Sequence, residues 1–458
     1  MKRFLGQIAP AIYYGILWRG WQLVAVPAML YLISVRFSPE LQGYHYTFAS
    51  LLALQSFFEL GLFLVILNIT AHEWAGLRLN ANKQVIGDIN ALSRLVSLGR
   101  FVFKYFSLAS VVFFVTVSTI GYIVFSRQGD SAVTWRWPWL LLTALAALNI
   151  LGGPFCSLLE GCNQVAQVYK MRIWQAVTSG IVGWTVIFFG GGLWSSVAIL
   201  TIQVGWVAWF LLINYNAFFS PFFRPPAGEV MSWRQDIWPM QWRLACSGVV
   251  NYFGSSLFVP VMFHYHGAVI AGQMGMTLQI IGGIQTVSSI WLTTKLPRFG
   301  VLIARREYSE LDRLWFGATI AFVAIYTVGA VGVYVVAAGG RYLEFSLVHR
   351  VLPLVPLAGF LTAGLIMNFS QSMSSYLRAH KKEPLLVMSV SISVLIGAVV
   401  IALGKTFGAS GAAWGYAASN FLGGIWLLQI WRRSRLDWHR PVTEPVRNLS
   451  PVSPSDGL

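Results

Sequence analysis

Two ionisable side chains, Arg19 and Glu59, lie deep inside long apolar stretches of this sequence. We expect the two stretches to be neighbouring antiparallel helices, with the two charges at similar depth. A guanidinium at such a position can hold an anionic group, and a carboxylate can take up a proton or a cation. The two charges can also neutralise each other as a structural ion pair that shields both from lipid. The residues alone leave both alternatives open.

Polar and aromatic side chains suited to binding a polar ligand accompany these charges. Aromatic rings offer flat apolar faces, and amides both donate and accept hydrogen bonds. The candidates are Trp18 and Gln22 beside Arg19, Gln55 one turn before Glu59, and Asn251 and Gln279 in the second half of the chain. Glu160, at the end of another apolar stretch, is a candidate gate. Facing lipid or hydrogen bonding between helices is the competing role for each of these residues.

The sequence has no pattern that marks an enzyme or a metalloprotein. It contains no HExxH motif, no phosphate-binding glycine loop and no cluster of cysteine and histidine ligands. The three cysteines, Cys156, Cys162 and Cys246, lack metal-ligand spacing and are odd in number, which favours reduced thiols. We therefore expect no catalysis, no metal and no cofactor.

The candidate side chains lie in long apolar runs, which make up most of the chain. Of all residues, 56% are hydrophobic and only 10% are charged. Soluble domains carry about 25% charged residues, and a membrane-spanning helix needs about 20 apolar residues. The sequence therefore predicts an all-α membrane protein. The spans are expected at 11–34, 43–69, 104–125, 138–159, 171–190, 194–215, 244–264, 269–293, 314–337, 353–374, 384–404 and 411–431.

Basic residues are distributed unevenly between the connecting segments. Alternate segments, with the two termini and the span ends next to them, hold 25 of the 32 lysines and arginines, and the opposite segments hold six. This satisfies the positive-inside rule with both termini in the cytoplasm. The net charge of +16 therefore indicates attraction to anionic membrane lipid, with no role in binding nucleic acid.

The chain divides into two halves of six spans each. We predict an N-terminal lobe at 1–215 and a C-terminal lobe at 244–431, around a central cavity. Residues 216–243 are expected to form a cytoplasmic linker at the membrane interface, because prolines and aromatic residues are concentrated there. Residues 432–458 are expected to be a disordered polar tail. Gly43 before the second span matches Gly272 early in the eighth, which favours a parallel repeat.

Three short stretches resemble a known transporter family. Residues 57–62 read FFELGL, residues 71–73 read AHE, and residues 159–165 read LEGCNQV. With the twelve-span layout, they resemble the polysaccharide or O-antigen flippases of the multidrug/oligosaccharidyl-lipid/polysaccharide exporter superfamily. The resemblance implies two six-helix lobes whose cavity opens alternately to each side of a bacterial inner membrane. Related lipid flippases carry several cationic residues in the cavity, whereas Arg19 is the one that we place deep in a span here.

The resemblance implies a polyprenyl-diphosphate-linked oligosaccharide as substrate, used in lipopolysaccharide or other polysaccharide synthesis, and glycan polymerases or ligases as partners. In this hypothesis Arg19 holds the diphosphate and Glu59 couples the cycle to an ion gradient. One alternative is a cation-coupled exporter of small amphipathic drugs, with the cation on Glu59. Another is a non-transporting membrane partner of a glycan-synthesis complex. A membrane glycosyltransferase is disfavoured, because the expected outer loops are short.

Overall fold

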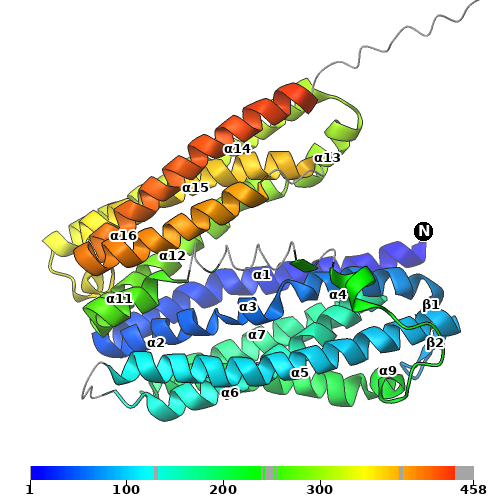
Figure 1. Ribbon diagram of the computed structural model, residues 1–458. Helices are drawn as coiled ribbons and strands as arrows, with labels where there is room; N and C mark the ends of the chain where they lie inside the picture. Colours follow the sequence, from blue (N-terminus) through cyan, green and yellow to red (C-terminus); the bar gives the residue numbers. More distant parts are fainter. Residues whose placement is uncertain are drawn as a thin grey trace, which may run out of the picture.

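Long helices in two bundles make up the described chain (Figure 1). The computed structural model describes residues 2–127, 133–238, 241–242, 252, 256–380 and 385–438. The first bundle contains α1 to α9, and the second contains α11 to α16. The prediction of an all-α membrane protein with two lobes is confirmed.

The first lobe begins with a single long helix, and its second span is divided into three. Its elements are α1 (Lys2–Arg36), α2 (Pro39–Leu52), α3 (Gln55–Glu59), α4 (Leu62–Glu73), β1 (Leu77–Leu79), β2 (Val85–Gly87), α5 (Ile89–Ser126), α6 (Arg136–Leu159), α7 (Val165–Phe188) and α8 (Trp194–Trp209). The two strands form an antiparallel hairpin between α4 and α5. Two short helices of the linker follow, α9 (Asn216–Phe219) and η4 (Ser220–Phe223).

The second lobe contains the remaining spans. Its elements are α11 (Phe258–His266), α12 (Ala268–Thr293), α13 (Leu296–Ala304), α14 (Tyr308–Tyr342), η6 (Ser346–Arg350), α15 (Leu354–Ala379) and α16 (Leu386–Trp438). Helix α16 holds the last two predicted spans, joined by a break at Gly408, whose φ is 61°. It runs on to Trp438, so the first residues of the expected disordered tail are helical; the rest of the tail lies outside the described residues.

Seven stretches of described helix are long and apolar enough to cross a membrane, or eight if the bent α2–α4 segment is counted as one span. Two of these stretches run for 53 residues, and each contains two predicted spans. Helix α12 is apolar but carries three glutamines, which lower its mean hydropathy. The seventh predicted span lies largely outside the described residues. The other eleven expected spans coincide with helices that the structure describes.

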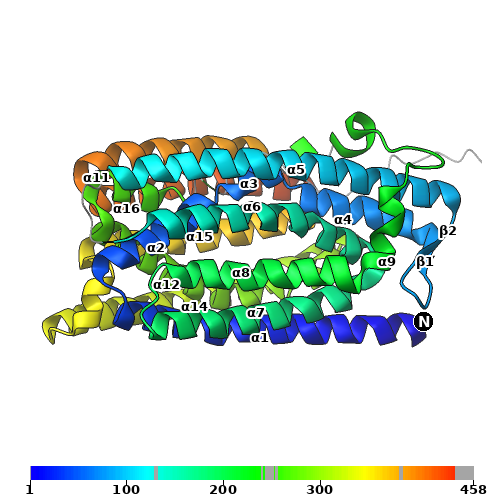
Figure 2. The ribbon, with the colours of Figure 1, turned by 90° about the horizontal axis from the view of Figure 1, so that it is seen from below.

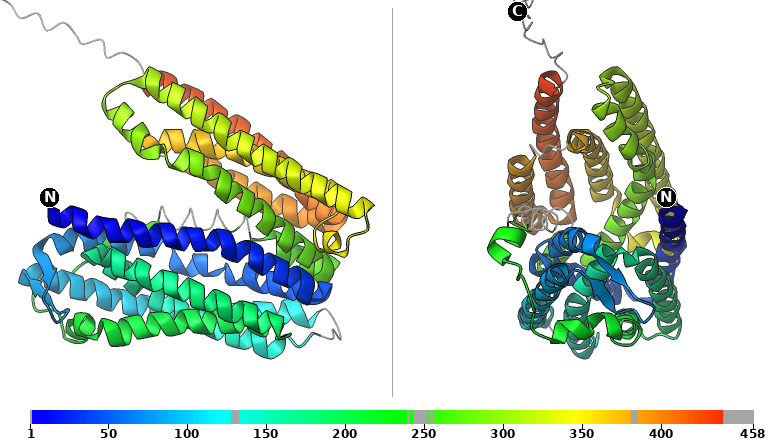
Figure 3. Two further views of the ribbon diagram at one scale, coloured as in Figure 1. Left: turned by 180° about the vertical axis from the view of Figure 1, so that it is seen from behind. Right: turned by 90° about the vertical axis from the view of Figure 1, so that its right-hand side faces the viewer.

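The two lobes meet at one end and diverge toward the other, which gives the V shape of Figures 1 and 3. At the closed end α12 packs across α2, α11 contacts α2 and α5, and η6 contacts α1. A Cβ on Gly43 of α2 would overlap the carbonyl oxygen of Ala268. A Cβ on Gly272 would lie 2.8 Å from the backbone nitrogen of Gly43. Glycine at both matched positions is therefore required for this close approach of two backbones.

Aromatic rings and buried polar groups also join the lobes at the closed end. The ring of Phe263 on α11 lies 5.0 Å from that of Tyr44 and 5.4 Å from that of Phe125. The amide nitrogen of Gln42 donates to the carbonyl oxygens of Gly272, at 2.8 Å, and Arg350, at 3.0 Å. Burial lowers the pKa of Arg350, and the charge of Glu40 opposes that shift.

Farther along α12, the face that meets α2 becomes uncovered. A Cβ on Gly275 would overlap the ring of Tyr46, whereas nothing lies within 4 Å of a Cβ placed on Gly282. These two glycines share a helix face, because they are seven residues apart. The lobes therefore separate within about 10 Å along α12. Figure 2 places the N-terminus, the β1–β2 hairpin and α9 at the end where the lobes are apart.

Candidate functional site

Helix α1 packs against α7, and not against the second span as expected. The indole nitrogen of Trp21 donates to the carbonyl oxygen of Ala176 at 3.2 Å. The ring of Trp18 lies 6.3 Å from that of Tyr169. Trp18, a candidate binding residue, is therefore at least in part a packing residue between α1 and α7.

Arg19 and Gln22 each follow one of these two tryptophans by one residue. They therefore lie on the side of α1 adjacent to the face that contacts α7. They are spaced so that the same stripe continues through Val26, Met29 and Ile33. Ile33, near the closed end, is 1% exposed, whereas Arg19 and Gln22 are both exposed. One stripe of α1 is thus buried where the lobes meet and uncovered where they diverge. Arg19 and Gln22 are therefore exposed on the part of α1 that runs toward the open end.

Glu59 is the last residue before a break in the second span. The next two residues, Leu60 and Gly61, have φ values of 46° and 67° and interrupt the helix. The segments on either side are bent by 43°. The Tyr105 hydroxyl of α5 donates to the Phe58 carbonyl at 3.1 Å and satisfies a backbone group beside the break. Interrupted spans are common binding sites in transporters, because their freed backbone groups can contact a ligand.

An aromatic contact lies close to the break. The ring of Phe57 lies 5.2 Å from the ring of Tyr252, a residue of the expected seventh span. Glu59 and Gln55, one turn earlier, are both half-buried. The carboxylate of Glu59 therefore lies directly before the interruption, in a segment that packs against α5.

Arg19 and Glu59 do not pair with each other in this conformation. Among the side chains that the structure describes, neither one takes part in an ion pair or a hydrogen bond. The structural ion pair, one of the two alternatives drawn from the sequence, is therefore not formed here.

Gln279 continues the face of α12 on which Gly272 and Gly275 contact α2, one turn nearer the open end. It is half-buried. It therefore lies at the point where the lobes begin to separate. Asn251, the remaining candidate of the second lobe, lies outside the described residues.

Glu160, the candidate gate, is held in an ion pair. Its carboxylate accepts a hydrogen bond from the Arg172 guanidinium at 2.6 Å, and its side chain is 10% exposed. It begins a short break between α6 and α7 (160–164), in which Asn163 has a φ of 60°. In this conformation Glu160 ties α7 to the end of α6, and its role as a gate stays a prediction.

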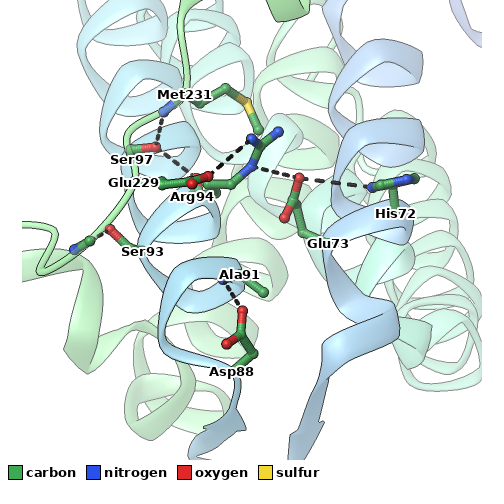
Figure 4. A network of polar contacts seen from close by, with 10 residues as sticks. His72, Glu73, Asp88, Ala91, Ser93, Arg94, Ser97, Glu229 and Met231 are labelled. Carbon is green, nitrogen blue, oxygen red and sulfur yellow. Dashed lines mark hydrogen bonds and ion pairs between the residues drawn. The ribbon is translucent and has the colours of Figure 1, made fainter.

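Arg94 holds the linker against the first lobe (Figure 4). Its guanidinium donates to Glu73 at 2.9 Å and lies 3.7 Å from Glu229 of the linker. The backbone nitrogens of Gly228 and Met231 donate to two serine hydroxyls of α5, at 2.9 and 3.0 Å. Sequence reasoning missed this network, because its charges lie far apart in the chain and each is ordinary for a loop.

The aromatic residues of the linker are partly packed on protein and partly exposed. Phe218 is fully buried, and Phe222 lies against Gly99 of α5, whereas Phe223 is 83% exposed. The first part of the linker is thus docked on the first lobe. Phe223, Trp233 and Trp238 remain exposed and are available to meet a membrane surface.

The arrangement of the two lobes is similar to that of solved transporters. An inward-facing multidrug resistance MATE family transporter of the MOP superfamily has a TM-score of 0.62 at 12% identity, over 91% of this chain and 95% of that one. The lipid II flippase MurJ, in an inward closed conformation, has a TM-score of 0.62 at 13% identity, over 93% of this chain and 90% of that one. The chain has the fold of the MOP-superfamily transporters.

The similarity to an outward-facing structure is lower. An outward-facing MATE family transporter of the same superfamily has a TM-score of 0.54 at 12% identity, over 95% of this chain and 96% of that one. No protein-family model and no curated protein sequence matches the chain. These structural neighbours are transporters and not enzymes, and at this identity they establish the fold alone.

Proposed function

We propose that this protein flips a polyprenyl-diphosphate-linked oligosaccharide from the cytoplasmic to the outer leaflet of a bacterial inner membrane. The observation that carries the proposal is the exposed guanidinium of Arg19, on the part of α1 that runs toward the open end. A diphosphate and a glycan cannot cross hydrocarbon unaided, because burying them without partners is too costly. Arginine suits the diphosphate, since its planar fork donates two parallel hydrogen bonds to phosphate oxygens.

In the proposed orientation both termini are cytoplasmic, so the lobes are apart on the cytoplasmic side. The headgroup enters between them beside Arg19, Gln22 and Gln279, while the prenyl tail stays in lipid. The units that rock are residues 1–215 and 244–431, about the contact of α2 with α12. The linker, residues 216–243, moves with the first lobe, because Arg94 and the serines of α5 hold it there.

Glu59 is the proposed coupling residue. It lies at an interruption of the second span and makes no ion pair with another described side chain. A carboxylate in that position can exchange a proton or a cation when the lobes move. The break at Leu60 and Gly61 gives the segment a hinge, so a change in charge at Glu59 can be transmitted to α4.

Export of small amphipathic drugs is the rival function, and a specific observation supports it. The inward-facing multidrug transporter matches this chain with the same TM-score as the lipid II flippase, 0.62. In that case Glu59 would bind the coupling cation and Arg19 would have no anionic partner. A role as a non-transporting partner in a glycan-synthesis complex requires neither residue.

Reconstitution separates these functions. The purified full chain in proteoliposomes should move a fluorescent lipid-linked oligosaccharide from one leaflet to the other. The Arg19→Ala variant should not, and Arg36→Ala on the same helix should retain transport. Drug-stimulated ion flux without movement of the glycan lipid would establish the rival function. A complete lack of transport by well-folded protein would favour the non-transporting role.

A further inference from the structure

A small basic pocket lies in the second lobe, at the end where the lobes are apart. The end of α12, helix α13 and the start of α14 border this open pocket, which has a volume of about 360 Å³. This is within the range of small-molecule pockets, about 300–1,000 Å³. Figure 1 shows α13 as a short helix near the end of the second lobe where the lobes are apart.

The polar side of the pocket carries excess positive charge. Lys295, Arg298, Arg313 and Glu310 line it. The guanidinium of Arg298 donates to the carboxylate of Glu310 at 2.6 Å. Within the described part of the chain, Lys295 and Arg313 have no acidic partner. Two uncompensated cations therefore face one small volume, which is the arrangement that attracts an anion.

The other side of the pocket is apolar. Trp291, Leu314, Gly317, Ala318 and Ala321 complete the lining. Trp291 is 46% exposed, as is common for an indole at a membrane surface. Two neighbouring apolar side chains of α14, Phe316 and Ile320, are 61% and 53% exposed. The pocket thus joins a cationic mouth to a helix surface suited to acyl chains.

Helix α13 is amphipathic and leaves the cations at its start exposed. Its apolar residues Phe299 and Leu302 are 0% and 3% exposed and pack into the lobe. Lys295 and Arg298, at its start, remain exposed. An amphipathic helix with buried apolar residues and exposed basic ones is typical of the interface with anionic lipid.

We propose that this pocket binds the phosphate headgroup of an anionic membrane phospholipid, with an acyl chain along α14. Free phosphate would satisfy the same charges, but it would leave the apolar wall without a partner. Under the orientation proposed above, the lipid comes from the cytoplasmic leaflet. The site is separate from Arg19 and does not depend on which substrate the protein transports.

Native mass spectrometry of the full chain, released from detergent, tests the proposal. We expect phosphatidylglycerol to bind one-to-one and more tightly than phosphatidylcholine. The double variant Lys295→Gln with Arg313→Gln should bind phosphatidylglycerol about thirtyfold more weakly, since two cations near an anionic group are lost. The matched control, Arg305→Gln with Arg306→Gln, removes the same charge outside the pocket and should bind normally. Equal loss in both double variants would overturn the proposal.

A further variant separates the lipid from a free anion without changing charge. Nothing lies within 4 Å of a Cβ on Gly317, and this residue lines the pocket, so we expect Gly317→Phe to fill its apolar side. This variant should bind phosphatidylglycerol more weakly. Its affinity for inorganic phosphate, measured by competition, should be unchanged. If inorganic phosphate displaces the lipid at equal concentration in the unmodified protein, the pocket is a free-anion site and the lipid assignment is wrong.

Discussion

At the scale of single residues, Arg19 and Arg36 of α1 differ in their surroundings. Arg36 lies at the closed end with its guanidinium 4.5 Å from the Phe188 ring, whereas Arg19 has no described partner. We predict that Arg19→Ala lowers transport of the lipid-linked substrate at least about tenfold, because hydrogen bonds to a charged group contribute about 1.5–3 kcal/mol. Arg19→Lys should restore part of it, since lysine keeps the charge but loses the planar fork. Initial rates in proteoliposomes measure the effect.

Arg36→Ala is the control for that prediction, and protein levels should stay near normal in all three variants. Unchanged transport by Arg19→Ala would mean that Arg19 makes no essential contact with the headgroup.

The absence of an ion pair between the described side chains of Arg19 and Glu59 leads to a second prediction. If they do not pair, replacing both together as Arg19→Leu with Glu59→Leu should leave the protein folded but inactive. If they pair in another state of the cycle, the double change should recover activity that each single change loses, because removing a buried pair is often nearly neutral. Glu59→Gln alone should abolish the response of transport to an imposed ion gradient. Activity has to be normalised to the amount of folded protein.

At the scale of elements, the spans could be predicted because apolar length and basic loops are local properties of the sequence. Their packing could not. The contact of α1 with α7 depends on Trp18 and Trp21. Tryptophans at these positions give the same sequence pattern whether they pack on a helix or face lipid. The break after Glu59 was also missed, because Leu60 adopts a left-handed conformation that costs a leucine about 1–2 kcal/mol and is imposed by its surroundings. Gly61 was the one local signal for that break.

The break gives a third prediction. Gly61→Ala places a Cβ on a residue whose φ is 67°, and it should destabilise the protein by about 1–2 kcal/mol. Gly61→Asn should cost less, because asparagine tolerates this conformation. The unfolding midpoint in detergent and the transport rate should fall in the same order. The control is Gly205→Ala in α8, where nothing lies within 4 Å of the added Cβ; a loss as large there would show that the break is not the cause.

At the scale of the whole molecule, charge and architecture agree on which segments share a side. The N-terminus, the β1–β2 hairpin and α9 lie at one end (Figure 2). They belong to segments predicted to be cytoplasmic from their lysines and arginines. Reporter fusions after residues 85, 230 and 440 should therefore read cytoplasmic, and fusions after 130 and 345 should read outside. An outside signal at 230 would require an odd number of spans in the first half.

The closed end gives the last prediction. Alternating access requires the contact between α2 and α12 to loosen when the lobes open on the other side. Gly43→Ala would force a methyl group into the carbonyl oxygen of Ala268, so the two backbones have to move apart. The change should favour the state that is open at this end. In the closed state the backbones of α2 and α12 can no longer approach each other closely, whereas the open state has room for the methyl group. Hydrogen exchange in the first turns of α2 and α12 should become faster, with the protein in lipid nanodiscs. Gly282→Ala on α12 adds the same methyl group where nothing lies within 4 Å and should leave exchange unchanged. If Gly43→Ala also leaves it unchanged, the contact between α2 and α12 is not the element that controls opening.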